Sequence, residues 1–437
     1  MNEHTITLFY LTEKLPIMLK ADALGILFAA VTILVWILCG IYAIGYFKGE
    51  KKRKRFWLFY ILAFIVILCL DFAGNIITFY FFYELMTLMS VPLVFHMETK
   101  EAIMAGLKYL FYSLCGAYFV LYGFYFVFQY ADTLTFTPGG VFSMEIASGQ
   151  NSILLVAAFC MLFGFSVKAG MFPMQSWLWT AHPAAPAPAS AFLSGIIVKS
   201  GVLGMIRTIY YLFGSEMLLG TWVQIVILTL TLITVFMGSF LAYREKWMKK
   251  RLAYSTISQI SYIVFGLLLF QPAAFIGALL HVVYHAVNKS CLFLSAGSVI
   301  HETGKEKAEE WVGIGKQMPL TLWCFTFASL SLVGIPPAAG FISKWNLCIG
   351  ALDSQVLVFS IVGPVILLIS ALLTAGYLLS ITVRGFLPGR DFEMKEKVHT
   401  PAVMIIPVAI LGFLSIWMGL FPGQLIEYIG QIVSVLL

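Results

Sequence analysis

The sequence predicts an all-α polytopic membrane protein, organised as a single membrane domain over residues 1–437. Of the 437 residues, 61% are hydrophobic and only 11% are charged, and the mean hydropathy is +0.94. Apolar spans of about 20 residues, the length that a helix needs to cross ~30 Å of hydrocarbon, recur about 12 times. No hydrophilic stretch between them exceeds about 20 residues, so no soluble domain is predicted.

The topology follows from the connections between the spans. Basic residues cluster in the connections at 48–55, 244–251, 301–316 and 384–397, whereas the stretch 130–151 carries no Lys or Arg. The predicted spans are 22–47, 56–72, 74–96, 102–129, 152–179, 187–213, 221–243, 252–270, 273–300, 319–350, 355–386 and 402–422. Every basic cluster then lies on one side of a cell membrane, which the positive-inside rule assigns to the cytoplasm, and both termini face outward. The net charge of +6 reflects that rule and gives no indication of nucleic-acid binding.

Several sequence signals of catalysis and cofactor binding are missing. The 7 cysteines are scattered over apolar spans without a Cys-x-x-Cys pair, so we expect neither a disulfide framework nor an iron–sulfur cluster in this chain. Walker and Rossmann phosphate-binding loops are also missing. The first residues lack the pattern of a cleaved signal peptide, so none is expected. Energy for any transport is expected from an ion gradient or from a partner subunit.

Four ionisable side chains lie deep inside predicted spans: Glu84, Lys168, Lys199 and Lys344. At mid-bilayer, each such charge raises the free energy of insertion by ~2.5–3.5 kcal/mol. Packing alone does not explain four of them. We expect them to pair, to face internal water, or both, which makes them candidates for an ion path.

A further polar set shares one face of a predicted helix. Its members are His281, Tyr284, His285, Asn288 and Lys289. Such a face can relay protons when water fills its gaps. The alternative is a set of polar contacts that hold helices together at ~0.6 kcal/mol each. Lys108, about two turns into its span, fits either a path residue or a flank that extends to the cytoplasmic surface.

Two predicted spans are interrupted near their middle. The interrupting residues are Gly170 and Pro173 after Lys168, and Gly334, Pro336, Pro337 and Gly340 before Lys344. Proline cannot donate a backbone hydrogen bond and glycine permits an unwound turn, so both helices are expected to be broken. A break at this depth is tolerated only inside protein or beside a wet cavity. A tryptophan follows each break, Trp177 in one case and Trp345 in the other.

The two breaks suggest an internal duplication. Paired interrupted spans in two halves are typical of inverted-repeat transporters whose ion path lies at the breaks. We predict two inverted five-helix repeats, at 56–213 and 221–386, each with one broken helix. Helices at 22–47 and 402–422 flank them.

Ordered motifs then indicate a family. They are FYELMTLMSVPL around Glu84, GFSVKAGMFPMQSWL around Lys168, AHPAAPAPASAFLSGIIVKSGVLGMIR around Lys199, HVVYHAVNKSCLFLSAGSVIH around His285 and GIPPAAGFISKW around Lys344. Over nearly its whole length the chain resembles the proton-translocating, antiporter-like membrane subunits of respiratory complex I, of Mrp-type antiporters and of membrane-bound nickel–iron hydrogenases. In motif it is most similar to the hydrogenase and formate-hydrogenlyase branch.

The resemblance implies a role for each candidate residue. Glu84 would modulate Lys168 at the first break, Lys199 and the helix of His285 would connect the two halves, and Lys344 would gate release to the outer side. The chain departs from the family pattern at three positions. Gln175 and Gln259 stand where relatives can have histidine, and Trp179 stands where they can have proline. Glutamine can bind water but cannot carry a proton as histidine does. The resemblance therefore does not define the proton route through the centre of this chain.

The resemblance also implies partners. Family members usually begin with two further helices, so this chain is expected to start at the third and to leave that position to a small membrane subunit. It is also expected to lack a long lateral helix after the last span.

Three functional interpretations remain. The favoured one is an ion-translocating subunit, with protons as the ion, in a redox-driven complex whose soluble partner subunits carry Fe–S and Ni–Fe centres. The second is a subunit of a Na⁺/H⁺ antiporter without a redox module. The third is a non-conducting structural subunit. This chain itself is expected to hold no cofactor or metal, so any enzyme activity would belong to the complex.

Overall fold

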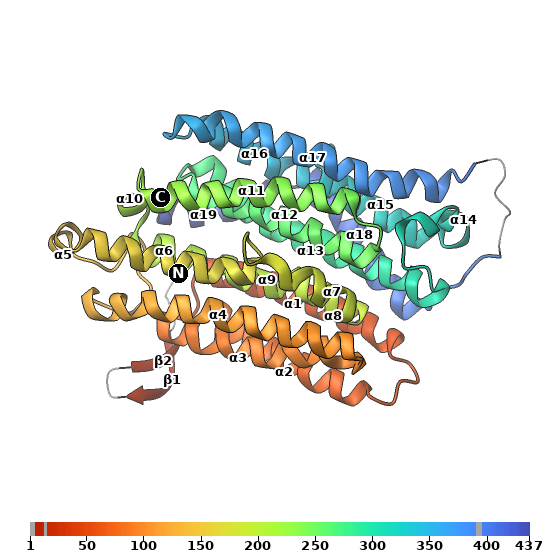
Figure 1. The fold of residues 1–437 in the computed structure, drawn as a ribbon, viewed down its shortest axis with the longest axis horizontal. Coiled ribbons are helices and arrows are strands. Elements are labelled where there is room, and N and C mark those ends of the chain that lie inside the picture. Colours follow the sequence, from red (N-terminus) through yellow and green to blue (C-terminus); the bar gives the residue numbers. More distant parts are fainter. Residues whose placement is uncertain (1–4, 13–14, 390–395) are drawn as a thin grey trace.

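The structure is a computed structural model that describes residues 5–12, 15–389 and 396–437. Most of the described chain is helical, and the long helices run along the long axis of the molecule (Figure 1). Within the described ranges, 8 helices are long and apolar enough to cross a membrane. The prediction of a helical, multi-spanning membrane protein is confirmed. The remaining predicted spans are also helical. Some carry charged residues, as α2 does with Arg53, Lys54 and Arg55, and the span 319–350 is divided by its break into two short helices.

The first half of the chain forms one side of the bundle. Its helices are α1 (Ala23–Tyr46), α2 (Arg53–Asp71), α3 (Ile76–Val94), α4 (Lys100–Tyr130), α5 (Met144–Gly149), α6 (Asn151–Ala169), α7 (Leu178–Ala184), α8 (Ala187–Phe192) and α9 (Val198–Ile206). Short turns η1 (Phe95–Met97) and η2 (Gln175–Trp177) connect them, and π-helical turns η3 (Leu193–Ile197) and η4 (Arg207–Phe213) flank α9. Glycines let α4 and α6 approach closely, since a Cβ on Gly116 would lie 2.7 Å from the carbonyl oxygen of Gly164.

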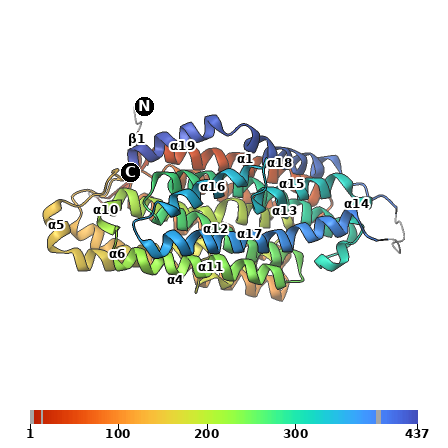
Figure 2. The same ribbon diagram turned by 90° about the horizontal axis from the view of Figure 1, so that it is seen from above.

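The second half packs around a buried central helix, α13. Its elements are α10 (Ser215–Leu218), α11 (Trp222–Arg244), α12 (Met248–Leu268), α13 (Pro272–Thr303), η5 (Ala308–Trp311), α14 (Ile314–Gln317), α15 (Pro319–Val333), α16 (Ala339–Leu352), α17 (Leu357–Phe386), α18 (Ala402–Leu420) and α19 (Gly423–Leu436). Helix α13 contacts α12, α15, α16 and α18 of its own half and α8 of the first half. Figure 2 shows α13 running along the interior, with α17 and α11 toward one surface and α1 and α19 toward another. The polar face of α13 therefore lies where the two halves meet.

Both predicted breaks are present. Helix α6 ends at Ala169, and Gly170 follows with φ of 80°. Helix α15 ends at Val333, and Gly334 follows with φ of 90°. A left-handed φ is readily accessible only to glycine, which explains why each helix stops there. The inverted relation of the halves and the repeat boundaries at 56–213 and 221–386 stay predictions.

Two elements were not predicted. Strands β1 (Thr5–Thr12) and β2 (Leu15–Lys20) form an antiparallel hairpin, so the all-α prediction is wrong for these residues. The backbone N–H of Gly74 donates to the carbonyl oxygen of Met18 and attaches the hairpin to the α2–α3 turn. Helix α19 continues the chain after α18, and it is amphipathic, with Ile429, Ile432 and Val433 on its buried side.

The basic connections gather at one end of the molecule. The α1–α2 turn and α14 lie on the right of Figure 1, whereas the hairpin, α5 and α10 lie on the left. Lys246 pairs with Glu309 at 3.9 Å, which joins the α11–α12 connection to η5. Residues 390–395 of the basic connection 384–397 are outside the described residues. Which membrane face each end meets stays a prediction of the positive-inside rule.

Candidate functional site

Lys168 lies at the first break inside a cage of hydroxyl groups. It is 1% exposed, and its Nζ donates to Thr87 Oγ1 at 2.8 Å, to Ser113 Oγ at 2.8 Å and to Tyr109 Oη at 3.3 Å. A further hydrogen bond of 2.7 Å joins Tyr109 Oη to Ser90 Oγ. Helices α3, α4 and α6 thus supply this site together. Three acceptors match the three hydrogens of an ammonium group, so the cage can hold a charged lysine.

Glu84 lies one turn before Thr87 on α3, on the same side of the helix. It is half-buried, and its Oε1 has no hydrogen-bond partner among the described residues. It forms no direct salt bridge with Lys168, whose Nζ is occupied by hydroxyl groups. The two charges are neighbours that interact through space, and a small side-chain movement would change that interaction.

Lys199 connects the two halves of the chain. It is 3% exposed, its Nζ donates to the carbonyl oxygen of Ser194 at 2.6 Å, and Nζ lies 2.7 Å from His285 Nδ1. Ser194 belongs to the π-helical turn η3, and such turns frequently occur at functional sites. One hydrogen bond thus joins Lys199 and His285, which are 86 positions apart in the sequence.

A row of rings continues from His285 to the second break. The ring centroids of His285 and His281 are 6.1 Å apart, and His281 stacks on Tyr262 at 5.7 Å. Nζ of Lys344 lies 4.8 Å from the centroid of Tyr262. His281 also shares a hydrogen bond of 2.9 Å with Ser343 Oγ on α16.

Lys344 is bound by the end of the broken helix. Its Nζ donates to the carbonyl oxygens of Leu332 at 2.5 Å and Val333 at 3.2 Å. These carbonyls are free because α15 stops there, and the C-terminus of a helix carries partial negative charge. The break and the lysine therefore stabilise each other.

Several buried polar atoms beside this row have no hydrogen-bond partner among the described residues. They are Gln259 Nε2 and Oε1, His281 Nε2, Tyr284 Oη, His285 Nε2 and Asn288 Oδ1. Leaving a buried polar atom unpaired raises the free energy by about 1–3 kcal/mol, and buried water commonly supplies the partner. The interior between the breaks has the polarity that a chain of waters requires.

The structure connects the remaining candidates less directly. No hydrogen bond joins Lys168 to Lys199, although a Cβ on Gly201 would lie 3.1 Å from Lys168 Cβ. Lys289 is buried and donates to the carbonyl oxygen of Leu252 at 3.1 Å. Lys108 is half-buried and lies 5.6 Å from the ring centroid of Trp179. Both interpretations of Lys108 stay open.

The similarity of the two breaks does not extend to their tryptophans. Trp177 is buried and donates from Nε1 to the carbonyl oxygen of Val167 at 2.9 Å, which supports the end of α6. Trp345 is 57% exposed on the outside of α16. Within the part of the chain that the structure describes, no group of His, Cys, Asp and Glu is placed to hold a metal ion.

Sequence reasoning missed a buried ion pair at the hairpin end of the molecule. Arg207 in η4 is 2% exposed and pairs with Asp22, the residue that caps α1. One guanidinium nitrogen of Arg207 lies 2.9 Å from Asp22 Oδ1, and the N–H of Gly25 also donates to this oxygen. The sequence signal for this ion pair was an aspartate at the start of one helix and an arginine at the end of another, 185 positions apart.

This pair predicts a pH-dependent contribution to stability. Asp22 lies just outside the α1 span. Burial raises its pKa, but the charge and hydrogen bonds of Arg207 and the Gly25 N–H outweigh burial, so the pKa is below its usual 3.8. A carboxyl group whose pKa is lowered by folding stabilises the fold above its unfolded pKa, and that contribution is lost as the pH falls through the folded pKa.

We expect Asp22→Asn to lower the free energy of unfolding by about 2 kcal/mol at neutral pH, because Arg207 stays buried without its anion. Thermal unfolding of the detergent-solubilised protein measures this. The difference in the free energy of unfolding between Asp22→Asn and wild type should become smaller below about pH 4, because Asp22 of the wild type then becomes protonated and loses its charge. Asp132→Asn is the control, since Asp132 is an exposed aspartate near the same end. Equal effects of the two substitutions would contradict the assignment.

Fold and site together define a class: a multi-spanning membrane subunit with two broken helices and a buried row of lysine and histidine side chains between them. Residues 73–374 match the family of NADH:quinone oxidoreductase/Mrp antiporter transmembrane proteins. The chain belongs to this family, as the motifs indicated. It is thus an antiporter-like membrane subunit of the complex I, Mrp and hydrogenase type.

Individual similarities span the branches of the family. The chain is 31% identical over 405 residues to NADH-quinone oxidoreductase subunit N of Desulforudis audaxviator (strain MP104C), covering 90% of this chain and 79% of that protein. It is 28% identical over 433 residues to hydrogenase-4 component B of Escherichia coli (strain K12), covering 93% of this chain but only 63% of that protein. The fold matches a chain of the Mrp complex from Dietzia sp. DQ12-45-1b with a TM-score of 0.86 at 21% identity, covering 99% of this chain and 87% of that one. The branch is therefore left open.

Proposed function

We propose that this chain translocates ions, with protons as the ion, as one membrane subunit of a redox-driven complex. The observation that carries the proposal is the buried row from Lys168 through Lys199, His285 and His281 to Lys344. Its links are the contact of 2.7 Å between Lys199 and His285 and the neighbouring rings of His285, His281 and Tyr262 that reach the second break. Ionisable side chains buried at this depth of a membrane are costly and commonly mark ion or proton pathways.

The proposed path has a role for each group. Glu84 changes the electrostatic field at Lys168, and the hydroxyl groups of Thr87, Ser113 and Tyr109 accept the hydrogens of the ammonium. Lys199 and His285 exchange a proton over their shared hydrogen bond, and His281 passes it toward Lys344 through water. Unpartnered atoms such as Gln259 Nε2 and Tyr284 Oη support a hydrated interior.

Partners are part of the proposal. Moving one charge against 100 mV requires ~2.3 kcal/mol, which a subunit without a redox centre must receive from elsewhere. We therefore place Fe–S and Ni–Fe centres in soluble partner subunits, and further membrane subunits beside this chain. The basic end of the molecule faces the cytoplasm in this proposal, and both termini face outward.

A second function is a subunit of a Na⁺/H⁺ antiporter without a redox module. The fold match to a chain of an Mrp complex supports it. The two functions differ in their partners. Purification of the tagged chain from its native membrane, followed by mass spectrometry and metal analysis, tests them. Co-purifying iron with cysteine-rich soluble subunits supports the redox-driven complex, whereas small membrane subunits without iron support the antiporter.

Glu84→Gln tests the path itself. We expect translocation to fall about tenfold, because the neutral amide of glutamine removes the carboxylate field next to Lys168 but leaves the lysine in place. Loss of a proton-transferring group itself typically lowers a rate by about 10²–10⁴-fold. Dye-monitored proton uptake by proteoliposomes measures this. Glu101→Gln is the matched control, since Glu101 is exposed in the first turn of α4. Full activity of both Glu84→Gln and Lys344→Ala would instead support a non-conducting structural subunit.

A further inference from the structure

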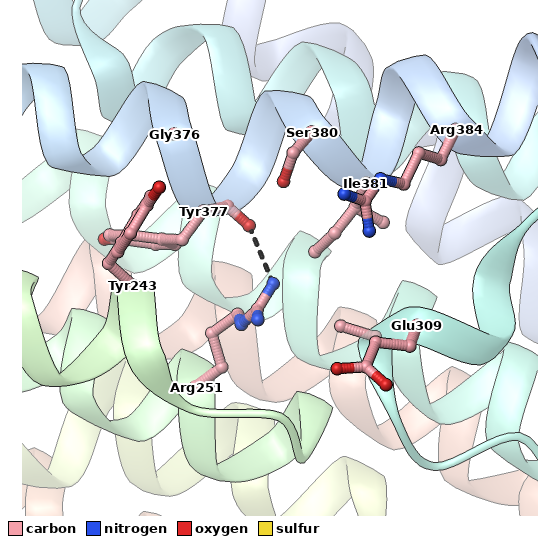
Figure 3. A pocket seen from close by; sticks show the side chains of 9 residues that line it. Tyr243, Arg251, Glu309, Gly376, Tyr377, Ser380, Ile381 and Arg384 are labelled. Atoms are coloured by element: carbon pink, nitrogen blue, oxygen red, sulfur yellow. Dashed lines mark hydrogen bonds between the residues drawn. The ribbon is translucent and has the colours of Figure 1, made fainter.

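A polar pocket opens between α11, α12, α17 and η5 at the basic end of the molecule. Its volume is about 250 Å³, and its lining includes Tyr243, Arg251, Glu309, Ser380 and Arg384. Figure 3 shows Ser380 and Arg384 extending from α17 on one side of this space and Arg251 extending toward it from the other side. The row of buried lysines and histidines does not pass through this pocket, so its polar groups have no role in the path described above.

The charge of the pocket is unbalanced. Arg251 is held in place by the carbonyl oxygens of Glu245, at 2.8 Å from Nε, and Tyr377, at 3.1 Å from Nη1. These carbonyl groups orient the guanidinium but do not neutralise its positive charge. Arg384 is exposed and forms no ion pair with a described residue. Glu309 is the one carboxylate among the described lining residues, and it already pairs with Lys246.

A separate apolar cavity, the α11–α17 groove, lies farther along the same two helices. A cavity of about 590 Å³ lies between α11 and the first turns of α17, lined by Leu232, Phe236, Met237, Phe359 and Ile366 among others. Helices α11 and α17 pack against each other along this line, and Phe240, between the two cavities on α11, is 39% exposed. The cationic pocket and the apolar groove are therefore two separate cavities on one pair of helices, with the exposed Phe240 between them.

The dimensions fit one leaflet of a membrane. Gly376 lines the pocket and Ile366 lines the groove, and ten residues of helix rise about 15 Å. That separation equals half of the ~30 Å hydrocarbon core, so an acyl chain held at the pocket would cross one leaflet before it reached the groove. Tyr243 lines the pocket, and aromatic residues are enriched at the headgroup region of membranes.

We propose that this site binds one phospholipid with an anionic headgroup. Its phosphate lies between Arg251 and Arg384 and accepts a hydrogen bond from Ser380, and one acyl chain runs along α11 and α17 toward the groove. Arginine pairs are well suited to phosphate because the planar guanidinium donates in a fork. Cationic pockets between helices at the cytoplasmic side are typical places for anionic lipids. A zwitterionic lipid lacks the net charge that two arginines favour.

Native mass spectrometry of the purified full chain, with its co-assembled subunits, tests this proposal after exchange into vesicles of phosphatidylcholine and phosphatidylglycerol in equal amounts. We expect wild type to retain phosphatidylglycerol preferentially. Arg384→Gln should lower its retention about fivefold, the effect of one basic residue at a membrane surface. Arg244→Gln is the matched control, because Arg244 is an exposed arginine at the end of α11 that does not line the pocket.

Ser380→Leu tests the shape of the site without changing its charge. The larger side chain should fill the pocket and reduce retention of phosphatidylglycerol while the chain stays folded. Equal retention of both lipids by wild type would overturn the proposal, as would equal losses in Arg384→Gln and Arg244→Gln. Displacement of the lipid by inorganic phosphate would assign the site to a free anion instead. Cross-linking of residue 380 to another subunit would assign the groove to a protein partner.

Discussion

Replacing Lys168 by alanine is expected to abolish proton translocation, with a loss well above the roughly tenfold expected for Glu84→Gln. Lys168 is the buried cation of the first break, and no other described side chain can take its place inside the hydroxyl cage. Proton uptake by proteoliposomes that hold the purified complex measures the effect. This expected loss rests on the proposal that the chain translocates protons.

Assembly should survive this substitution. Alanine leaves Thr87, Ser113 and Tyr109 without the ammonium, but hydroxyl groups can donate to one another, as Tyr109 and Ser90 already share a hydrogen bond of 2.7 Å. The yield of co-purifying subunits should therefore match wild type. Lys100→Ala is the control, because Lys100 is exposed at the start of α4. Normal translocation by Lys168→Ala would exclude Lys168 from the path.

Gly340→Ala is expected to lower the free energy of unfolding by about 3 kcal/mol or more, because the new methyl group overpacks a tight contact. A Cβ at this position would lie 1.8 Å from the carbonyl oxygen of Ser331. That oxygen belongs to the backbone of α15, so the two halves of the broken helix must separate. Thermal unfolding in detergent and the yield of folded protein both report the change.

A glycine elsewhere provides a matched control. Gly430 lies within α19, and nothing lies within 4 Å of a Cβ added there. Gly430→Ala should leave the melting temperature unchanged or raise it slightly, since alanine favours a helix. If Gly340→Ala behaved in the same way, the close contact of α15 and α16 would not be needed for stability.

Local chemistry explains which parts of the fold could be predicted. The breaks followed from glycine and proline within apolar spans, because these residues change the backbone wherever they occur. The basic connections identified one end of the molecule, because clusters of lysine and arginine are also recognisable from the local sequence. The hairpin lies before the first predicted span, which begins at residue 22, and helix α19 lies after the last, which ends at residue 422. Neither segment is long enough to cross a membrane, so a search for spans of about 20 residues passes over both.

The candidate site was predictable residue by residue but not as an arrangement. A lysine inside an apolar span is visible in sequence, and its partners are not. Thr87 and Ser113 are ordinary polar residues until α3 and α4 bring them to Lys168. The contact of Lys199 with His285 depends on a π-helical turn, which no local pattern of residues indicates. The role of these groups in moving protons is still a prediction.

The two breaks balance their lysines in different ways. At Lys344 the counter-charge comes from peptide carbonyl groups, Leu332 and Val333, which cannot gain or lose a proton. At Lys168 the nearest anion is Glu84, a group that can. Chemical conditions can therefore alter the electrostatic field at one end of the row while the field from the backbone at the other end stays constant. One counter-charge that can change and one that is fixed make the two ends of the row chemically unequal.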